Sequence, residues 1–194
     1  MVFSSTVFLF LFLPFTIMVY YNPWFKGRKF RNYFLLFMSM VFYAYGEPLF
    51  VGIMILEIVI GWFLGKKIEL MQQQKNKKRW LYIGVFFFVA MLFVFKYLTF
   101  FNTQFRVFFN VSTPDIDIAL PIGISFFTFQ LLSYIFDVYY GKAKAQSNIL
   151  NVGLYITLFP QLIAGPIVRY DVIEKQILLM ECFALVMVWV KKFL

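Results

Sequence analysis

Long apolar runs and short polar segments alternate along the whole chain. The apolar runs cover residues 2–21, 33–64, 80–101, 120–140 and 154–170. A membrane-spanning helix needs about 20 predominantly apolar residues, so this pattern predicts an all-α, polytopic integral membrane protein with about five or six membrane segments. We see no internal repeat and no domain boundary, and residues 1–194 are therefore predicted to form a single membrane domain.

The second run is too long for one simple span, and Gly46, Glu47 and Pro48 interrupt it. Basic segments flank the run on both sides, and basic loops favour the cytoplasmic face. The chain between them must then cross an even number of times, so we predict a helical hairpin that turns at residues 46–48, with two short or tilted arms. Glu57 lies in the second arm. It is either a functional carboxylate or a residue that faces a wet groove or a partner helix.

The basic residues predict the topology. They gather in segments 26–31, 66–79 and 142–144, which places these segments in the cytoplasm and the N-terminus outside. The polar segment 72–78 is predicted to be a solvated connector, and 102–119 an outer loop. No basic segment precedes the first run and no cleavage site follows it, which indicates a retained span rather than a signal peptide.

Composition supports a membrane protein. The chain is 62% hydrophobic with 29 Phe, and its mean hydropathy is +0.80, whereas soluble domains average about 45–50% apolar residues. The net charge of +9 lies in the short loops, so we read it as a topology signal rather than as a nucleic-acid surface. A single cysteine, Cys182, excludes an internal disulfide, and the sequence contains no histidine and no cluster that predicts a metal site.

Residues 120–140 carry polar side chains on an apolar helix. Gln130, Ser133 and Asp137 fall at i, i+3 and i+7 and so share one helix face. The other sides of the helix are occupied by Leu131, Leu132, Ile135 and Phe136. Unpaired polar groups in hydrocarbon cost several kcal/mol, so the polar face should meet a cavity or neighbouring helices. Ordinary hydrogen bonding between helices is the alternative, and Asp137 is close enough to the following lysines to be an interfacial residue.

Residues 154–170 contain breaks at Pro160 and at Gly165-Pro166, with Gln161 between them. Each proline removes a backbone hydrogen bond and disfavours helix in the residue before it. Pro121 breaks the preceding apolar run in the same way. We therefore predict a re-entrant segment here rather than a continuous span. Arg169 follows this segment and would bind a phosphate or carboxylate at the interface, or anchor the chain to lipid headgroups.

Two strings carry a resemblance. PIGISFFTFQLLSYIFDVYYG at 121–141 and FPQLIAGPIVRY at 159–170 closely resemble signature segments of the membrane-bound O-acyltransferase family. The opening residues 1–21 and the YAYGEP turn at 43–48 are similar to the bacterial branch that acylates cell-surface polymers such as alginate and teichoic acid. The resemblance covers residues 1 to about 175, and it implies the N-terminal part of a many-helix fold around a tunnel.

The resemblance also implies a reaction. An acyl group, expected to be acetyl, passes from a cytoplasmic thioester donor, acyl-CoA or an acyl carrier protein, to hydroxyls of an extracellular or periplasmic polysaccharide. No bound cofactor is implied. The implied location is the bacterial cytoplasmic membrane, and the implied partners are the lipid bilayer, the donor and polysaccharide-modifying proteins outside, with no nucleic acid. The residues that would line the tunnel or its mouth are Gln130, Ser133, Asp137, Gln161 and Arg169.

The chain departs from the family pattern in two ways. The family gives the general base to a histidine in the later half of a chain more than twice this long, and no histidine exists here, so no catalytic residue is carried over. Residues 176–194 form an atypical tail, and we hypothesise a truncation, such as a frameshift near Ile177, that leaves the chain inactive alone. A non-catalytic membrane subunit that scaffolds a polymer-modifying complex is the alternative. A transporter ranks last because its inverted repeat is missing.

Overall fold

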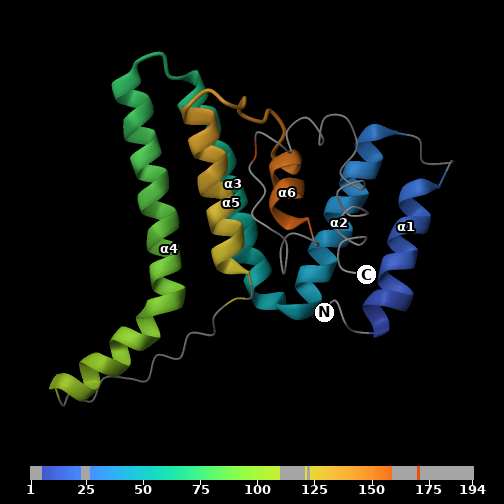
Figure 1. Ribbon diagram of the computed structural model, residues 1–194, viewed down its shortest axis with the longest axis horizontal. Helices are drawn as coiled ribbons and strands as arrows, with labels where there is room; N and C mark the ends of the chain where they lie inside the picture. Colours follow the sequence, from blue (N-terminus) through green and yellow to red (C-terminus); the bar gives the residue numbers. More distant parts are fainter. Residues whose placement is uncertain (1–5, 23–26, 110–120, 122, 159–169, 171–194) are drawn as a thin grey trace.

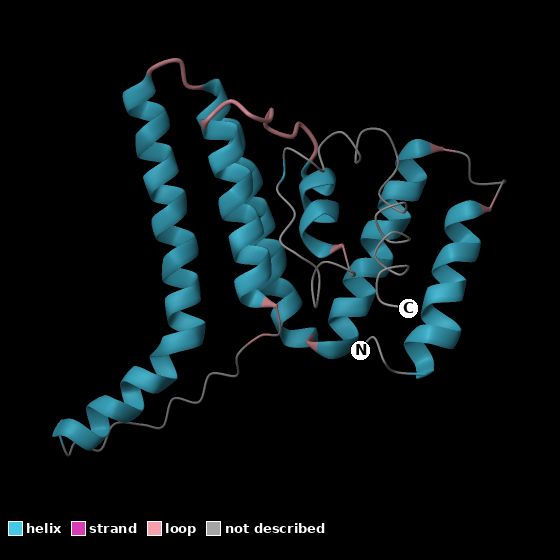
Figure 2. Cartoon of the chain, viewed as in Figure 1, coloured by secondary structure: helices cyan, strands magenta, loops and turns pink. Residues whose placement is uncertain are grey.

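In the computed structural model, the described residues are 6–22, 27–109, 121, 123–158 and 170. This part of the chain is helical and contains no strand (Figure 2), which confirms the predicted all-α class. The elements in chain order are the π-helix η1 (Phe8–Phe12), α1 (Leu13–Tyr21), α2 (Arg28–Gly46), the 3-10 turn η2 (Pro48–Phe50), α3 (Val51–Leu70), α4 (Gln74–Phe109), α5 (Ile124–Tyr139) and α6 (Ile149–Thr157).

Two stretches are long and apolar enough to cross a membrane: Pro48–Leu70, with 23 residues, and Gln74–Tyr97, with 24. These helices support the membrane character that the sequence predicts. The expected total of five or six membrane segments and the re-entrant segment stay predictions. Pro160, Gln161, Gly165, Pro166 and Arg169 lie outside the described residues, as does the tail 176–194.

The first apolar run is helical but irregular at Pro14. This proline stands in the first turn of α1, directly after the π-helix η1. A proline ring clashes with the carbonyl four residues earlier, and a wider π turn is a common way for a helix to absorb such a disruption. The Thr16 hydroxyl donates to the Phe12 carbonyl at 2.7 Å. Phe12 in turn packs on Phe42 of α2, with ring centroids 5.6 Å apart.

The predicted break in the second apolar run is confirmed. Helix α2 ends at Gly46, and the short turn η2 leads directly into α3. The arms, at 19 and 20 residues, are longer than expected. Helix α6 packs against both arms and lies between them in Figure 1. A Cβ added to Gly153 of α6 would lie 3.4 Å from the Leu36 side chain of α2, an ordinary van der Waals distance.

The connector predicted at 72–78 is shorter than expected. Helix α4 begins at Gln74, so only residues 71–73 lie between α3 and α4. Glutamine, lysine and arginine are good helix formers, so a polar composition does not prevent this segment from extending the helix. The expected outer loop is also shorter than predicted, since α4 continues to Phe109. Figure 1 shows the last turns of α4 bending away from the other helices.

Glycines hold α3, α4 and α5 close together. A Cβ added to Gly61 of α3 would lie 2.5 Å from Leu131, and one added to Gly65 would lie 2.5 Å from the Tyr134 hydroxyl, both on α5. A Cβ on Gly84 of α4 would lie 2.9 Å from Ile135. Small residues four apart are a common device for close packing of membrane helices. This packing sets the register of α5 against α3.

Asn148 begins α6. Its side-chain oxygen accepts a hydrogen bond from the Leu150 N–H at 3.0 Å, and its amide nitrogen donates to the Tyr33 hydroxyl of α2 at 3.2 Å. The first bond is a helix cap. The helix ends at Thr157, three residues before Pro160, as expected for a chain approaching a proline. Nine residues rise about 14 Å, so α6 alone does not cross a membrane about 30 Å thick.

Replacing Asn148 with alanine should make the start of α6 exchange its amide protons faster. The cap is lost, which costs about 1 kcal/mol, or roughly a fivefold increase in local opening. Hydrogen exchange of the Leu150 amide measures this change. Asn148→Ser keeps a capping oxygen and should recover most of the protection. Equal exchange rates in the alanine variant and the unmodified chain would contradict the capping role.

Candidate functional site

A buried carboxyl group lies between two apolar helices. Glu57 of α3 is 0% exposed, and the Thr128 hydroxyl of α5 donates to its Oε2 at 2.9 Å. Its other oxygen, Oε1, has no hydrogen-bond partner among the described residues. Of the alternatives that the sequence leaves open, the structure shows that Glu57 faces a partner helix. A buried oxygen without a partner costs about 1–3 kcal/mol, so Oε1 is a candidate contact for a ligand.

The local sequence explains why Glu57 meets Thr128. Glu57, Gly61 and Gly65 follow one another at intervals of four, and side chains at this spacing lie on one face of a helix. The two glycines bring α5 against that face, with Leu131 over Gly61 and Tyr134 over Gly65. One end of this contact then places Thr128 opposite the carboxyl. The Glu57–Thr128 pair is therefore a consequence of the glycine spacing.

Further buried hydroxyls without a hydrogen-bond partner in the described part of the chain include those of Ser39 and Tyr43 of α2 and Thr157 at the end of α6. The Tyr43 ring packs edge-on against Phe127 of α5, with centroids 6.4 Å apart. Each buried polar group without a partner needs an explanation, because most such groups in folded proteins are paired. Together with Glu57, they give α2, α3 and α6 polar atoms that can bind a hydroxyl or a carbonyl group.

Two of the three predicted polar residues of α5 are buried, Gln130 at 2% and Asp137 at 4% exposed, whereas Ser133 is partly exposed. The Ser133 hydroxyl lies 3.5 Å from Asp137 Oδ2. Thr128 and Gln130 are about 200° apart on the helix, so α5 carries polar groups on opposite sides. The structure thus brings Ser133 and Asp137 together but does not join Gln130 to the Glu57–Thr128 pair.

The rest of α5 differs from the expected pattern. Leu131, Leu132 and Ile135, which were expected to occupy the other sides of a lipid-compatible helix, are buried. The exposed side instead carries Phe126 and Phe129. Burial of Gln130 and Asp137 therefore does not separate a tunnel wall from ordinary contacts between helices, and their predicted role as tunnel lining stays a prediction. Of the residues predicted to break the helices in this region, Pro121 is described. It is buried, and its carbonyl accepts a hydrogen bond from the Ile124 N–H at 3.3 Å.

The structure describes Tyr170 but not residues 159–169 and 171–194 on either side of it in the chain. It is 0% exposed, and its ring packs edge-on against Tyr134 of α5 at 4.7 Å and against Tyr155 of α6 at 5.2 Å between centroids. The Tyr134 hydroxyl also accepts a hydrogen bond from the Gln146 N–H at 3.1 Å. This aromatic contact packs Tyr170 against α5 and α6.

Sequence reasoning missed Thr128 altogether and named Tyr43 only within the YAYGEP turn. A threonine or tyrosine in an apolar helix is common and attracts no attention alone. The signal that could have found Thr128 is the carboxyl of Glu57, which needs a buried donor from a neighbouring segment. In the described ranges, no group of three acidic, cysteine or histidine side chains is placed to hold a metal ion.

The chain matches proteins with stated activities. The "Probable alginate O-acetylase AlgI" of Pseudomonas aeruginosa is 39% identical over 184 residues, which is 90% of this chain and 34% of that relative. The protein of the same name from Azotobacter vinelandii is 39% identical over 90% of this chain and 36% of the relative. The "Peptidoglycan O-acetyltransferase" of Helicobacter pylori is 29% identical over 88% of this chain and 37% of the relative.

The chain thus spans about a third of the length of the curated relatives that it matches. No protein-family model matches it, and no solved structure does. The matches nevertheless cover about nine tenths of this chain at 37–39% identity. They confirm the resemblance to bacterial polymer-acylating enzymes: over about nine tenths of its length, this chain is similar to proteins named as probable alginate O-acetylases.

Proposed function

We propose that this chain forms part of a membrane O-acetyltransferase. The enzyme moves an acetyl group from a cytoplasmic thioester donor, acetyl-CoA or an acyl carrier protein, to hydroxyls of a polysaccharide outside the cytoplasmic membrane. The observation that carries the proposal is the relationship to the alginate O-acetylases over nine tenths of the chain. The peptidoglycan O-acetyltransferase match supports O-acetylation of a cell-envelope polymer as the general reaction.

The buried polar atoms support a role for this part of the enzyme. Transfer to a hydroxyl needs groups that hold the acceptor hydroxyl and the acyl carbonyl inside a membrane. The Oε1 atom of Glu57 and the hydroxyls of Tyr43 and Thr157 are polar and buried, and they have no hydrogen-bond partner among the described residues. We assign them to one wall of the passage that the reactants share. Gln130 and Asp137, on the other side of α5 from Thr128, are proposed to line the passage as well. Ser133, Gln161 and Arg169 are proposed to lie in the passage or at its mouth.

The proposed topology follows the charges. Lys66 and Lys67 lie near the end of α3, and Lys142 follows α5. The start of α4 carries Lys75, Lys77, Lys78 and Arg79. These ends carry an excess of positive charge, which favours the cytoplasmic side. The chain then crosses the bacterial cytoplasmic membrane several times, with its N-terminus outside. The donor approaches from the basic side, and polysaccharide-modifying proteins act on the opposite side.

A chimera tests the proposal. Residues 1–175 of this chain replace the matching region of the Pseudomonas aeruginosa relative, in a strain that lacks its own copy. We expect the chimera to restore O-acetyl groups to the secreted alginate, measured by NMR of the polymer. A chimera that reaches the membrane in normal amount but adds no acetyl groups would contradict the proposal.

The chain alone is the second arm of the same experiment. It contains no histidine, and the family assigns the general base to a histidine, so the purified chain with acetyl-CoA should show no transfer. This absence favours the second candidate function, a membrane subunit that is not catalytic alone and scaffolds a polymer-modifying complex. Measurable turnover by the purified chain would exclude that candidate.

A further inference from the structure

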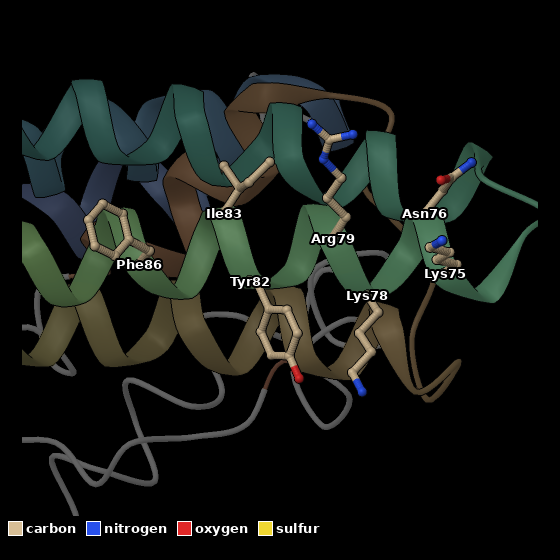
Figure 3. A pocket seen from close by; sticks show the side chains of 7 residues that line it. All are labelled: Lys75, Asn76, Lys78, Arg79, Tyr82, Ile83 and Phe86. Atoms are coloured by element: carbon tan, nitrogen blue, oxygen red, sulfur yellow. The ribbon is translucent and has the colours of Figure 1, made fainter.

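Helix α4 carries an open hollow of about 690 Å³ on its surface. One end of the hollow is basic and is formed by Lys75, Lys78 and Arg79. The other end is formed by Tyr82, Ile83 and Phe86. Figure 3 shows that these side chains all extend from the same helix. A second hollow shares Tyr82 and Phe86 and continues along α4 over further apolar residues. We call the two hollows together the strip, and Lys75, Lys78 and Arg79 its basic end.

The strip lies on the side of α4 that faces away from the other helices. Among the α4 residues whose burial is described, Leu81, Gly84 and Phe88 are buried, and they face α3 and α5, which α4 contacts. Phe86, in the strip, is 77% exposed. Figure 1 places α4 at the edge of the helical assembly. The strip is therefore available to molecules of the surrounding bilayer.

The apolar part of the strip has the length of a lipid chain. Tyr82, Phe86, Val89 and Phe93 are spaced i, i+4, i+7 and i+11 and are all exposed, so they form one stripe along the helix. We call these four residues the apolar stripe. Eleven residues of helix rise about 16 Å, which is close to half of a hydrocarbon core about 30 Å thick. The stripe thus reaches from the interface to about the bilayer centre.

The basic end is not neutralised by the described part of the chain. None of Lys75, Lys78 and Arg79 makes an ion pair there. The Lys78 ammonium nitrogen instead makes a cation–π contact with Tyr82, 5.6 Å from the ring centroid. All three side chains are exposed. Three uncompensated cations within about one and a half helical turns attract an anion, and basic clusters beside a membrane helix bind anionic headgroups.

We propose that this strip binds an anionic phospholipid, with the phosphate at the basic end and one acyl chain along the apolar stripe. The charge selects the headgroup class, and the stripe selects a membrane lipid over a soluble phosphate. The proposal concerns the outer face of α4 and does not depend on the proposed acetyl transfer. It also gives a function to Lys75 and Lys78, which lie in the predicted connector 72–78.

Native mass spectrometry of the full chain in detergent tests the proposal, with phosphatidylglycerol and phosphatidylcholine as probes. Each basic residue near an anionic lipid adds about fivefold to its affinity, so phosphatidylglycerol should bind at least about tenfold more tightly than phosphatidylcholine. Replacing Lys75, Lys78 and Arg79 together with glutamine should abolish this preference. The matched control replaces Lys66, Lys67 and Lys142 with glutamine, which removes the same charge from outside the hollow and should keep the preference.

Three results would overturn the proposal. Equal loss of preference in the control variant would mean that only the overall surface charge attracts the lipid. Displacement of phosphatidylglycerol by millimolar glycerol phosphate would show a site for soluble phosphate. A dimer that disappears on Phe86→Ser, with phosphatidylglycerol binding unchanged, would show that a second copy of the chain covers the stripe. In the proposed site, Phe86→Ser weakens binding of both lipids and leaves the preference for the anionic one.

Discussion

Glu57→Gln in the chimera should lower alginate O-acetylation at least about tenfold without loss of folded protein. Glutamine has nearly the same shape and retains an oxygen that can accept from Thr128, the bond seen at 2.9 Å. It replaces Oε1, the atom without a partner in the described structure, by an amide nitrogen that donates. A reactant hydroxyl that donates to Oε1 would lose its acceptor, and a tenfold loss corresponds to about 1.4 kcal/mol. O-acetyl groups per sugar, divided by the amount of chimera in the membrane, measure the effect.

The matched control is Phe129→Leu. Phe129 lies on the same helix as Thr128 but is 48% exposed, so its replacement should leave acetylation unchanged. Unaltered acetylation in the Glu57→Gln chimera would show that the carboxyl serves only the contact between α3 and α5. A loss of folded protein would point to the same structural role, and thermal unfolding of the purified variant separates the two effects.

A double-mutant cycle gives an independent measure of the pair. Thr128→Val removes the donor and leaves both carboxyl oxygens buried without partners, and the resulting cost is about 1–3 kcal/mol. In a Glu57→Leu background the same change removes no hydrogen bond and should cost much less. The difference is the coupling between the two side chains. Additive effects would mean that the hydrogen bond contributes nothing to stability, whatever its role in transfer.

Much of the fold could be predicted because its signals are local. The helical class follows from the long apolar runs. The break after Gly46 follows from glycine and proline. Glycine interrupts a helix through its backbone freedom, and proline through its fixed φ and missing N–H, so neither effect depends on other parts of the chain. The end of α6 before Pro160 has the same origin. Such features need no knowledge of neighbouring helices.

The surroundings of α5 could not be predicted for a physical reason. Hydrocarbon chains of lipid and apolar side chains of a neighbouring helix are equally apolar, so Leu131 and Ile135 fit a lipid-facing and a buried position alike. Their burial depends on Gly61 and Gly84, which lie on other helices. The partner of Glu57 was missed for the same reason. Thr128 is 71 residues away in the chain, and only the register of α3 against α5 brings the two together.

That register should depend most strongly on Gly65. We expect Gly65→Ala to lower the free energy of unfolding by about 1–3 kcal/mol, the usual cost of overpacking. The added Cβ would lie 2.5 Å from the Tyr134 hydroxyl and 2.7 Å from its ring. The ring has little room to retreat, because its hydroxyl accepts from the Gln146 N–H and its other contacts include the Tyr170 ring. Equilibrium unfolding in mixed micelles measures the change.

Two other glycines of α3 turn this expectation into an ordered series. At Gly61 the nearest obstacle is the terminal methyl of Leu131, whereas the next closest atoms are 3.5 Å away, so Gly61→Ala should cost less than Gly65→Ala. At Gly52 a Cβ meets no atom within 4 Å, and alanine is about 1 kcal/mol better than glycine inside a helix. Gly52→Ala should therefore be neutral or stabilising. If all three substitutions behave alike, helix propensity governs α3, and the close contact with α5 does not set the position of Thr128 beside Glu57.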